Sequence, residues 1–185
     1  MNVSRHGMDK SLLRGQLQTI KNNFALAQAG IVLMAEPDAL ERFDAAFAQI
    51  KFHPEASTFG YIRYVFETDD FLKHATNEFR NSVLRNCLKE TFEFVKLYAD
   101  QTNQASIVKS APWYQFLRIV RNCLSHDLQI SFRKSDLKYL PATWSGLTLD
   151  RSMQNSPLQM KDFLSRSKAL ELMDEVIEYV EKHVG

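Results

Sequence analysis

The sequence predicts an all-α fold, a bundle of about five helices with a small β-hairpin insertion. Apolar residues make up 45% of the 185 residues and recur mostly at spacings of three and four, the periodicity of helices with one buried face. The six Gly and five Pro are few, whereas β-sandwiches and barrels need turn residues at every connection. A chain of this length is typical of one domain, so we expect residues 1–185 to form a single domain.

Two helices are expected in the first third of the chain. Residues 8–36 carry a single apolar stripe at helical spacing. Pro37 suits the first position of a second helix, which has its own apolar face and ends before Pro54. The aromatic segment 55–68 has no clear periodicity and fits a loop with a short helix.

The middle of the chain predicts a pair of helices within residues 69–128. Asp69 and Asp70 are good N-terminal caps for a helix of about 30 residues. A polar linker at 100–106 follows, and Pro112 opens the second helix of the pair, which has an apolar inner face.

The C-terminal third predicts a hairpin and a closing helix. Within 129–150, the segments Gln129–Phe132 and Gly146–Leu149 are short, alternating and β-prone, which favours a small β-hairpin. Residues 157–184 form the last expected helix, which begins after Pro157.

The charge balance restricts how this chain could contact nucleic acid. Lys and Arg number 23 against 22 Asp and Glu, a formal net charge of +1. A protein that holds nucleic acid through bulk charge has a strongly basic surface, so any contact here must be local or brief. Residues 109–138 do carry six basic and two acidic side chains, whereas 157–185 carry four basic and six acidic ones.

Nothing in the sequence indicates export or membrane insertion. The N-terminal residues are not followed by an apolar run of the secretory type, and the longest apolar stretch is shorter than the roughly 20 residues of a membrane span. The two cysteines do not suggest a secreted disulfide scaffold. We therefore expect a cytoplasmic protein that does not contact membranes.

One polar sector of the second paired helix carries candidate chemistry. Arg121 and His126 are five residues apart, about 140° around and about 7.5 Å along a helix, which a guanidinium stem can span. Asn122 lies one turn before His126 and can hydrogen-bond to it. A permanent cation beside an imidazole that titrates near neutral pH suits reactions at a phosphate. Arg118 and Ser125 fall in the same sector and are candidate substrate-binding residues.

The segment Arg121-Asn122-Cys123-Leu124-Ser125-His126 resembles the motif of the HEPN superfamily. That motif is an Arg, a polar residue and then a His, separated by four to six positions, on the third or fourth helix of a small bundle. Many members are metal-independent endoribonucleases of toxin–antitoxin, abortive-infection and CRISPR systems. The resemblance implies an HEPN-like bundle that cleaves RNA without a metal or another cofactor.

The resemblance also implies roles for individual residues. His126 would transfer a proton as the RNA 2′-hydroxyl attacks its own phosphate, Arg121 would stabilise the phosphorane, and Asn122 would position the pair. Family members usually form homodimers in which two such helices face one cleft, and an antitoxin or another inhibitor protein is an expected partner. Where some HEPN toxins carry a regulatory Tyr two residues after the His, this chain has Leu128, so control by adenylylation is not expected.

Other interpretations of the same residues stay open. Arg121 and His126 also fit a surface Arg and a helix-end His bonded to backbone or water. Cys87 and Cys123 could join His74 and His126 in a zinc site, but no Cys-x-x-Cys pair supports this, and buried cysteines are the common outcome. The alternative functions are a non-catalytic HEPN module that binds nucleotide, RNA or a protein partner, and a helical interaction protein unrelated to HEPN.

Overall fold

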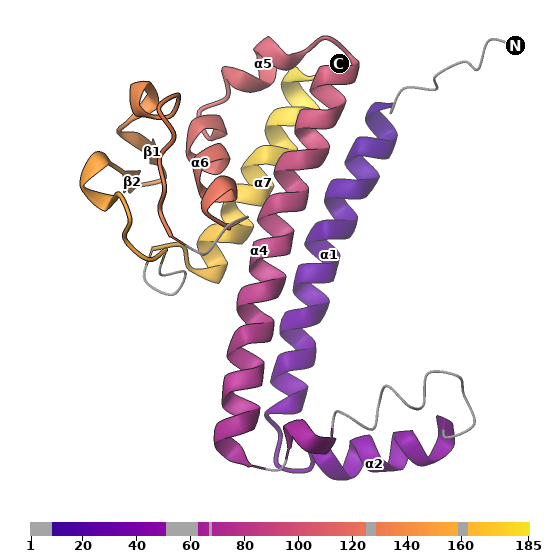
Figure 1. Cartoon of the computed structure of the whole chain (residues 1–185). Coiled ribbons are helices and arrows are strands. Elements are labelled where there is room, and N and C mark those ends of the chain that lie inside the picture. The colour runs from indigo at the N-terminus through magenta and orange to yellow at the C-terminus, as the bar shows by residue number, and fades with distance from the viewer. Residues whose placement is uncertain (1–8, 51–62, 67, 125–128, 159–162) are drawn as a thin grey trace, which may run out of the picture. The chain divides into compact units, whose positions relative to one another are not determined.

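The computed structural model describes residues 9–50, 63–66, 68–124, 129–158 and 163–185. It confirms a mostly helical chain with one small two-stranded antiparallel sheet (Figure 1). None of the helices in these ranges is both long and apolar enough to cross a membrane. The elements are α1 (Lys10–Met34), α2 (Ala39–Ile50), α4 (Asp69–Gln101), α5 (Ala105–Lys109), α6 (Tyr114–Leu124), the 3-10 helix η1 (Leu137–Tyr139), β1 (Ala142–Trp144), β2 (Leu147–Leu149), the 3-10 helix η2 (Arg151–Met153) and α7 (Arg166–His183).

Local sequence signals account for several helix boundaries. At the start of α1, Asp9 Oδ1 accepts a 2.7 Å hydrogen bond from the backbone N–H of Leu12, which satisfies one of the free donors of the first turn. This bond and that from Ser11 lower the pKa of Asp9. The predicted linker 100–106 is only partly right, because α4 continues to Gln101 and the short helix α5 begins at Ala105.

The chain divides into two compact units, and the boundaries fall inside α1 and α4. Residues 23–83 form one unit, in which the rings of Phe43 and Phe47 stack at 6.3 Å and the Arg63 guanidinium pairs with Asp44 at 3.1 Å. Residues 1–22 and 84–185 form the other unit, which contains the predicted site. The expectation of a single domain stays a prediction.

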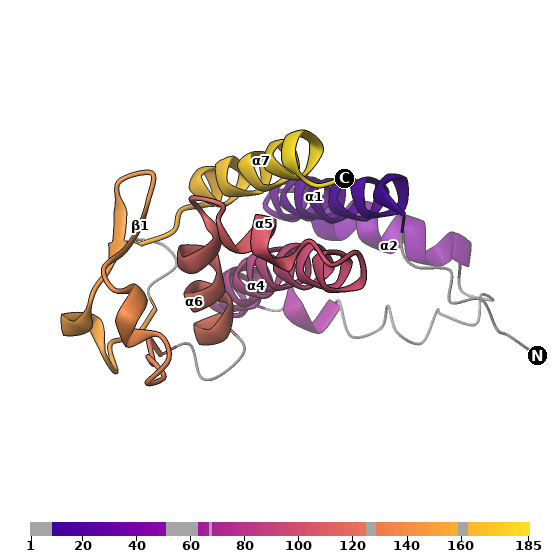
Figure 2. The same cartoon turned by 90° about the horizontal axis from the view of Figure 1, so that it is seen from above.

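In the unit that contains the predicted site, α6 is packed on two sides. Both views place α6 between the β-hairpin and the C-terminal half of α4 (Figures 1 and 2). On the hairpin side, the rings of Phe116 and Trp144 lie 5.7 Å apart, and on the α4 side those of Tyr114 and Phe92 lie 5.6 Å apart. Because it is enclosed in this way, α6 is buried on more faces than an ordinary amphipathic surface helix.

The predicted hairpin is present, but its first strand was wrongly assigned. Ala142–Trp144 pairs with Leu147–Leu149 across a two-residue turn, in which Ser145 (φ 45°) and Gly146 (φ 80°) both have left-handed conformations. Such a turn matches the twist of the strands and needs no long loop to close. Gln129, which was expected in the hairpin, forms an isolated antiparallel bridge with Pro157 instead.

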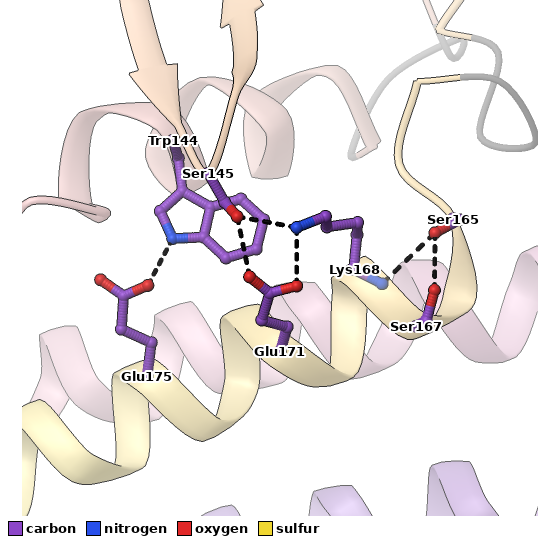
Figure 3. A network of polar contacts seen from close by, with 7 residues as sticks. All are labelled: Trp144, Ser145, Ser165, Ser167, Lys168, Glu171 and Glu175. Atoms are coloured by element: carbon purple, nitrogen blue, oxygen red, sulfur yellow. Dashed lines mark hydrogen bonds and ion pairs between the residues drawn. The ribbon is translucent and has the colours of Figure 1, made fainter.

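Polar contacts hold the tip of the hairpin against α7 (Figure 3). Trp144 Nε1 donates to Glu175 Oε2 at 2.6 Å, and Ser145 Oγ donates to Glu171 Oε1 at 2.7 Å. The Lys168 ammonium bridges Ser145 Oγ and Glu171 Oε2, both at 2.7 Å. The bonds from Lys168 and Ser145 lower the pKa of Glu171. This network orients the hairpin that covers one side of α6.

A buried ion pair connects α6 to the segment before the hairpin. Arg118 Nη1 lies 2.7 Å from Asp136 Oδ1, and the Asp136 side chain is only 1% exposed. The second carboxylate oxygen accepts the backbone N–H of Arg133 at 2.8 Å. A buried carboxylate is tolerated only when its charge and lone pairs are satisfied, as they are here.

We expect Asp136→Asn to destabilise the protein by about 2–4 kcal/mol, because the substitution leaves the Arg118 charge without its buried partner. Asp174→Asn is the matched control, since Asp174 also pairs with a cation, Lys21, but is 56% exposed. That substitution should cost less than about 1 kcal/mol. Urea unfolding followed by circular dichroism measures both, and equal losses would contradict a stabilising role for the buried pair.

Candidate functional site

The candidate site is built on the only edge of α6 that is not buried. Three of its eleven residues are not buried, and they follow one another at a spacing of three: Gln115, Arg118 and Arg121. We call this row the polar edge of α6. Residues three apart lie on the same side of a helix, separated by about 4.5 Å along its axis. Asn122 was expected on the polar sector of this helix, but it is only 8% exposed. Among the described residues of α6, the polar surface is therefore limited to this edge.

Arg121 is held from two elements. Its Nη1 donates a 3.0 Å hydrogen bond to Asn122 Oδ1 on the same helix, and its Nη2 forms an ion pair with Glu93 Oε1 on α4. Its Cζ also lies 5.9 Å from the centre of the Phe92 ring. The Arg121 side chain is 28% exposed, although its Nε is buried, so the guanidinium is oriented by these contacts within a partly exposed side chain.

Asn122 is a buried polar residue whose amide oxygen is satisfied by Arg121. A buried amide that lost this partner would cost free energy, so the pair Arg121–Asn122 favours one arrangement of both side chains. The structure thus brings together two of the three predicted catalytic residues. The predicted contact from Asn122 to His126 stays a prediction.

Ser125 and His126 lie outside the residues that the structure describes, which run to Leu124 and begin again at Gln129. Their roles in substrate binding and proton transfer stay predictions.

Arg118, the other predicted substrate-binding residue, lies one turn before Arg121 on the polar edge. Its Nε donates to Gln115 Oε1 at 2.9 Å, its Nη1 pairs with Asp136, and its Cζ lies 5.3 Å from the centre of the Tyr139 ring. Its Nη2 has no hydrogen-bond acceptor among the described residues. Most of its charge is thus matched within the protein, while one donor nitrogen is unused.

Glu93 is the part of this site that the sequence analysis missed. Glu93 is the lone acidic residue in the apolar stretch 91–95, and an isolated carboxylate in such a stretch is the signal that could have identified it. Its side chain is 46% exposed, although the oxygen that pairs with Arg121, Oε1, is itself buried.

The two cysteines are buried in the core. Burial raises the pKa of the Cys87 thiol to about 12, and its Sγ contacts Met173 Sδ at 2.7 Å. Cys123 is 1% exposed. Within the described ranges, no group of three or more His, Cys, Asp or Glu side chains is placed to hold a metal ion.

We expect Cys87 to react with the thiol reagent DTNB only after unfolding. With a pKa of about 12, roughly one thiol in ten thousand is ionised at pH 8, and burial blocks access to that fraction. The Cys123→Ala variant reports on Cys87 alone. If its native form reacted at pH 8 as fast as its urea-unfolded form, the buried position of this thiol would be contradicted.

No family model, no curated protein and no solved structure matches the chain.

Proposed function

We propose that the protein is a metal-independent endoribonuclease of the HEPN type, with a homodimeric active site and a role as a toxin or in phage defence. The observation that supports this most is the oriented and partly exposed side chain of Arg121, followed in the sequence by a buried, hydrogen-bonded Asn122 and then by His126. Arg121 would supply the charge, and His126 the proton-transfer group, that phosphodiester cleavage needs.

Arg121 suits the charged role. Its guanidinium cannot lose its proton at physiological pH and has five N–H donors in a planar fork that matches phosphate oxygens. The bonds to Asn122 and Glu93 reduce the conformational freedom that would be lost when a phosphate is bound. Arg121 would therefore stabilise the additional negative charge of the phosphorane.

His126 suits the proton-transfer role, because imidazole accepts and releases protons near neutral pH. The neutral ring would take the proton of the RNA 2′-hydroxyl while the 2′-oxygen bonds to the adjacent phosphorus. The bond from phosphorus to the 5′-oxygen then breaks, and the protonated His126 of a second copy would donate a proton to that oxygen. The products are a 2′,3′-cyclic phosphate and a 5′-hydroxyl. Ser125 would contact the substrate beside these groups.

A second candidate function is a non-catalytic HEPN module that binds nucleotide, RNA or a protein partner. The ion pair between Arg121 and Glu93 favours the form that binds a protein partner, because a carboxylate that already occupies the guanidinium competes with any phosphate. The two functions differ in outcome: the module would retain RNA or its partner unchanged, whereas the nuclease would release cleaved ends.

We expect the wild-type protein to cleave single-stranded RNA in excess EDTA and to leave 2′,3′-cyclic phosphate ends. His126→Ala should reduce the rate by about 10²–10⁴-fold through loss of proton transfer. Arg121→Ala should reduce it by about 10²–10³-fold through loss of charge stabilisation. Gel analysis of end-labelled RNA measures the rates, and treatment with polynucleotide kinase identifies the ends.

Arg85→Ala is the matched control for this experiment. The stretch Arg85-Asn86-Cys87-Leu88 repeats the first four residues of the motif but continues with Lys89-Glu90. Its loss should change the rate less than about twofold. Equal rates for wild type and His126→Ala would refute the catalytic assignment, and a requirement for Mg²⁺ would refute the metal-independent mechanism.

We expect a dimeric mass at micromolar concentration, measured by light scattering, because a base and an acid are supplied by the histidines of two copies. Mixed dimers of one wild-type and one His126→Ala subunit, isolated with two affinity tags, should then be as inactive as the variant itself. A monomeric mass for the active enzyme, or half activity in the mixed dimer, would contradict the paired-histidine mechanism.

A further inference from the structure

A depression of about 260 Å³ lies beside the polar edge of α6, and neither the motif nor the proposed reaction explains it. Its walls come from the end of α5, from α6 and from η1 with the turn before it. We call it the lysine–tyrosine pocket. The side chains that matter here are Lys109, Tyr114, Arg118, Ser135, Lys138 and Tyr139.

The charge of this pocket is positive. Lys109 and Lys138 have exposed side chains, and neither has a carboxylate partner among the residues that the structure describes. The charge of Arg118 is matched by Asp136, and its Nη2 is itself buried, so Arg118 borders the pocket and the unmatched charge comes from the two lysines. The two lysines and Ser135 line the same depression, and their ammonium and hydroxyl groups are donors that suit an anion with several oxygens.

The tyrosines indicate which part of a ligand would bind. The Tyr139 ring already has cations over it, since Lys138 Nζ lies 4.9 Å and Arg118 Cζ 5.3 Å from its centre. A nucleobase would have to displace them to stack there. Tyr114 is 6% exposed, and burial raises the pKa of its hydroxyl although Arg118 and Lys96 oppose that shift. The pocket therefore suits a phosphate group better than a base.

The position of the pocket relates it to the candidate site. Arg118 belongs both to the pocket and to the polar edge, and Arg121 follows one turn later on the same edge. That step is about 4.5 Å along the helix axis, so a strand whose phosphate contacts Arg121 reaches the pocket with a neighbouring phosphate. A second depression of about 150 Å³ shares Lys109 and Tyr114 and extends the surface toward Lys96.

We propose that the lysine–tyrosine pocket binds a backbone phosphate of single-stranded RNA that flanks the phosphate at Arg121. The proposal rests on the proposed function for the identity of the ligand as RNA. It assigns Lys109 and Lys138 to binding only, and neither residue belongs to the proposed catalytic group.

The experiment measures binding of a fluorescein-labelled 2′-O-methyl RNA 12-mer, which cannot be cleaved because its 2′-hydroxyls are blocked. Fluorescence anisotropy is recorded at several salt concentrations for wild type, for Lys109→Ala/Lys138→Ala and for Lys73→Ala/Lys134→Ala. The last variant is the matched control, since it removes the same charge at exposed lysines that do not line the pocket. All four lysines are exposed, so unchanged thermal melting is expected for both variants.

The pocket variant should bind at least about fivefold more weakly at low salt, and the slope of log K against log salt should fall by roughly 0.7, for one lost phosphate contact on a single strand. The control should stay within about twofold of wild type. Equal weakening in both variants, or no binding by wild type, would overturn the proposal. Displacement of the RNA by polyglutamate at equal charge concentration would also overturn it, because the surface would then select any polyanion.

Inorganic phosphate and uridine monophosphate, as competitors, distinguish a free phosphate from a strand. Full displacement of the RNA by either compound at low millimolar concentration would overturn the assignment to RNA. Weak competition by both compounds, together with reduced RNA affinity only in Lys109→Ala/Lys138→Ala, would support the assignment to RNA. Pocket-dependent binding without cleavage of ordinary RNA would refute the proposed nuclease activity but not the pocket. Cleavage unaffected by Lys109→Ala/Lys138→Ala would refute RNA binding by the pocket but not the nuclease activity.

Discussion

The burial of α6 is the constraint on which the candidate site depends. Apolar side chains face the β-hairpin on one side and α4 on the other, and burial of each large one contributes about 1.5–3 kcal/mol. Polar groups of α6 can reach water only along the edge that these contacts leave open, where Gln115, Arg118 and Arg121 lie. The packing that stabilises this unit therefore also places the cations in one row, and the contacts of the hairpin tip with α7 keep that packing in place.

The two arginines of this row are balanced by carboxylates in different surroundings. Asp136 is 1% exposed and bonded through both oxygens, so Arg118 is tied to the segment before the hairpin. Glu93 is 46% exposed as a whole side chain, although its pairing oxygen is buried, and it binds Arg121 from α4. One arginine is thus tied to a buried carboxylate and borders a basic pocket, while its neighbour one turn away pairs with a carboxylate on α4.

Much of the fold could be predicted from the sequence because helical periodicity and capping are local signals. Helix α4 does begin at Asp69, although the capping bond comes from Thr68, whose Oγ1 accepts the N–H of Phe71, and the hairpin lies within the expected range. Alternation alone could not assign the first strand of the hairpin. The segment that begins at Gln129 also alternates, but Gln129 forms a bridge with Pro157. For the candidate site, the sequence predicted Arg118, Arg121 and Asn122 on one sector of a helix but not their neighbour Glu93, which is distant along the chain and lies on another helix.

The sequence by itself determined the residue types and their order: an Arg and an Asn in adjacent positions, a His five residues after the Arg, and local excess of positive charge in a nearly neutral chain. The local charge follows from the composition, and the spacing of the Arg, Asn and His can be interpreted from the repeat of a single α-helix. Only the tertiary structure decided that Asn122 is buried against Arg121, that Asp136 matches Arg118, and that Lys109 and Lys138 flank one pocket. Those contacts join elements far apart in sequence, and the packing that brings such elements together has no local signature.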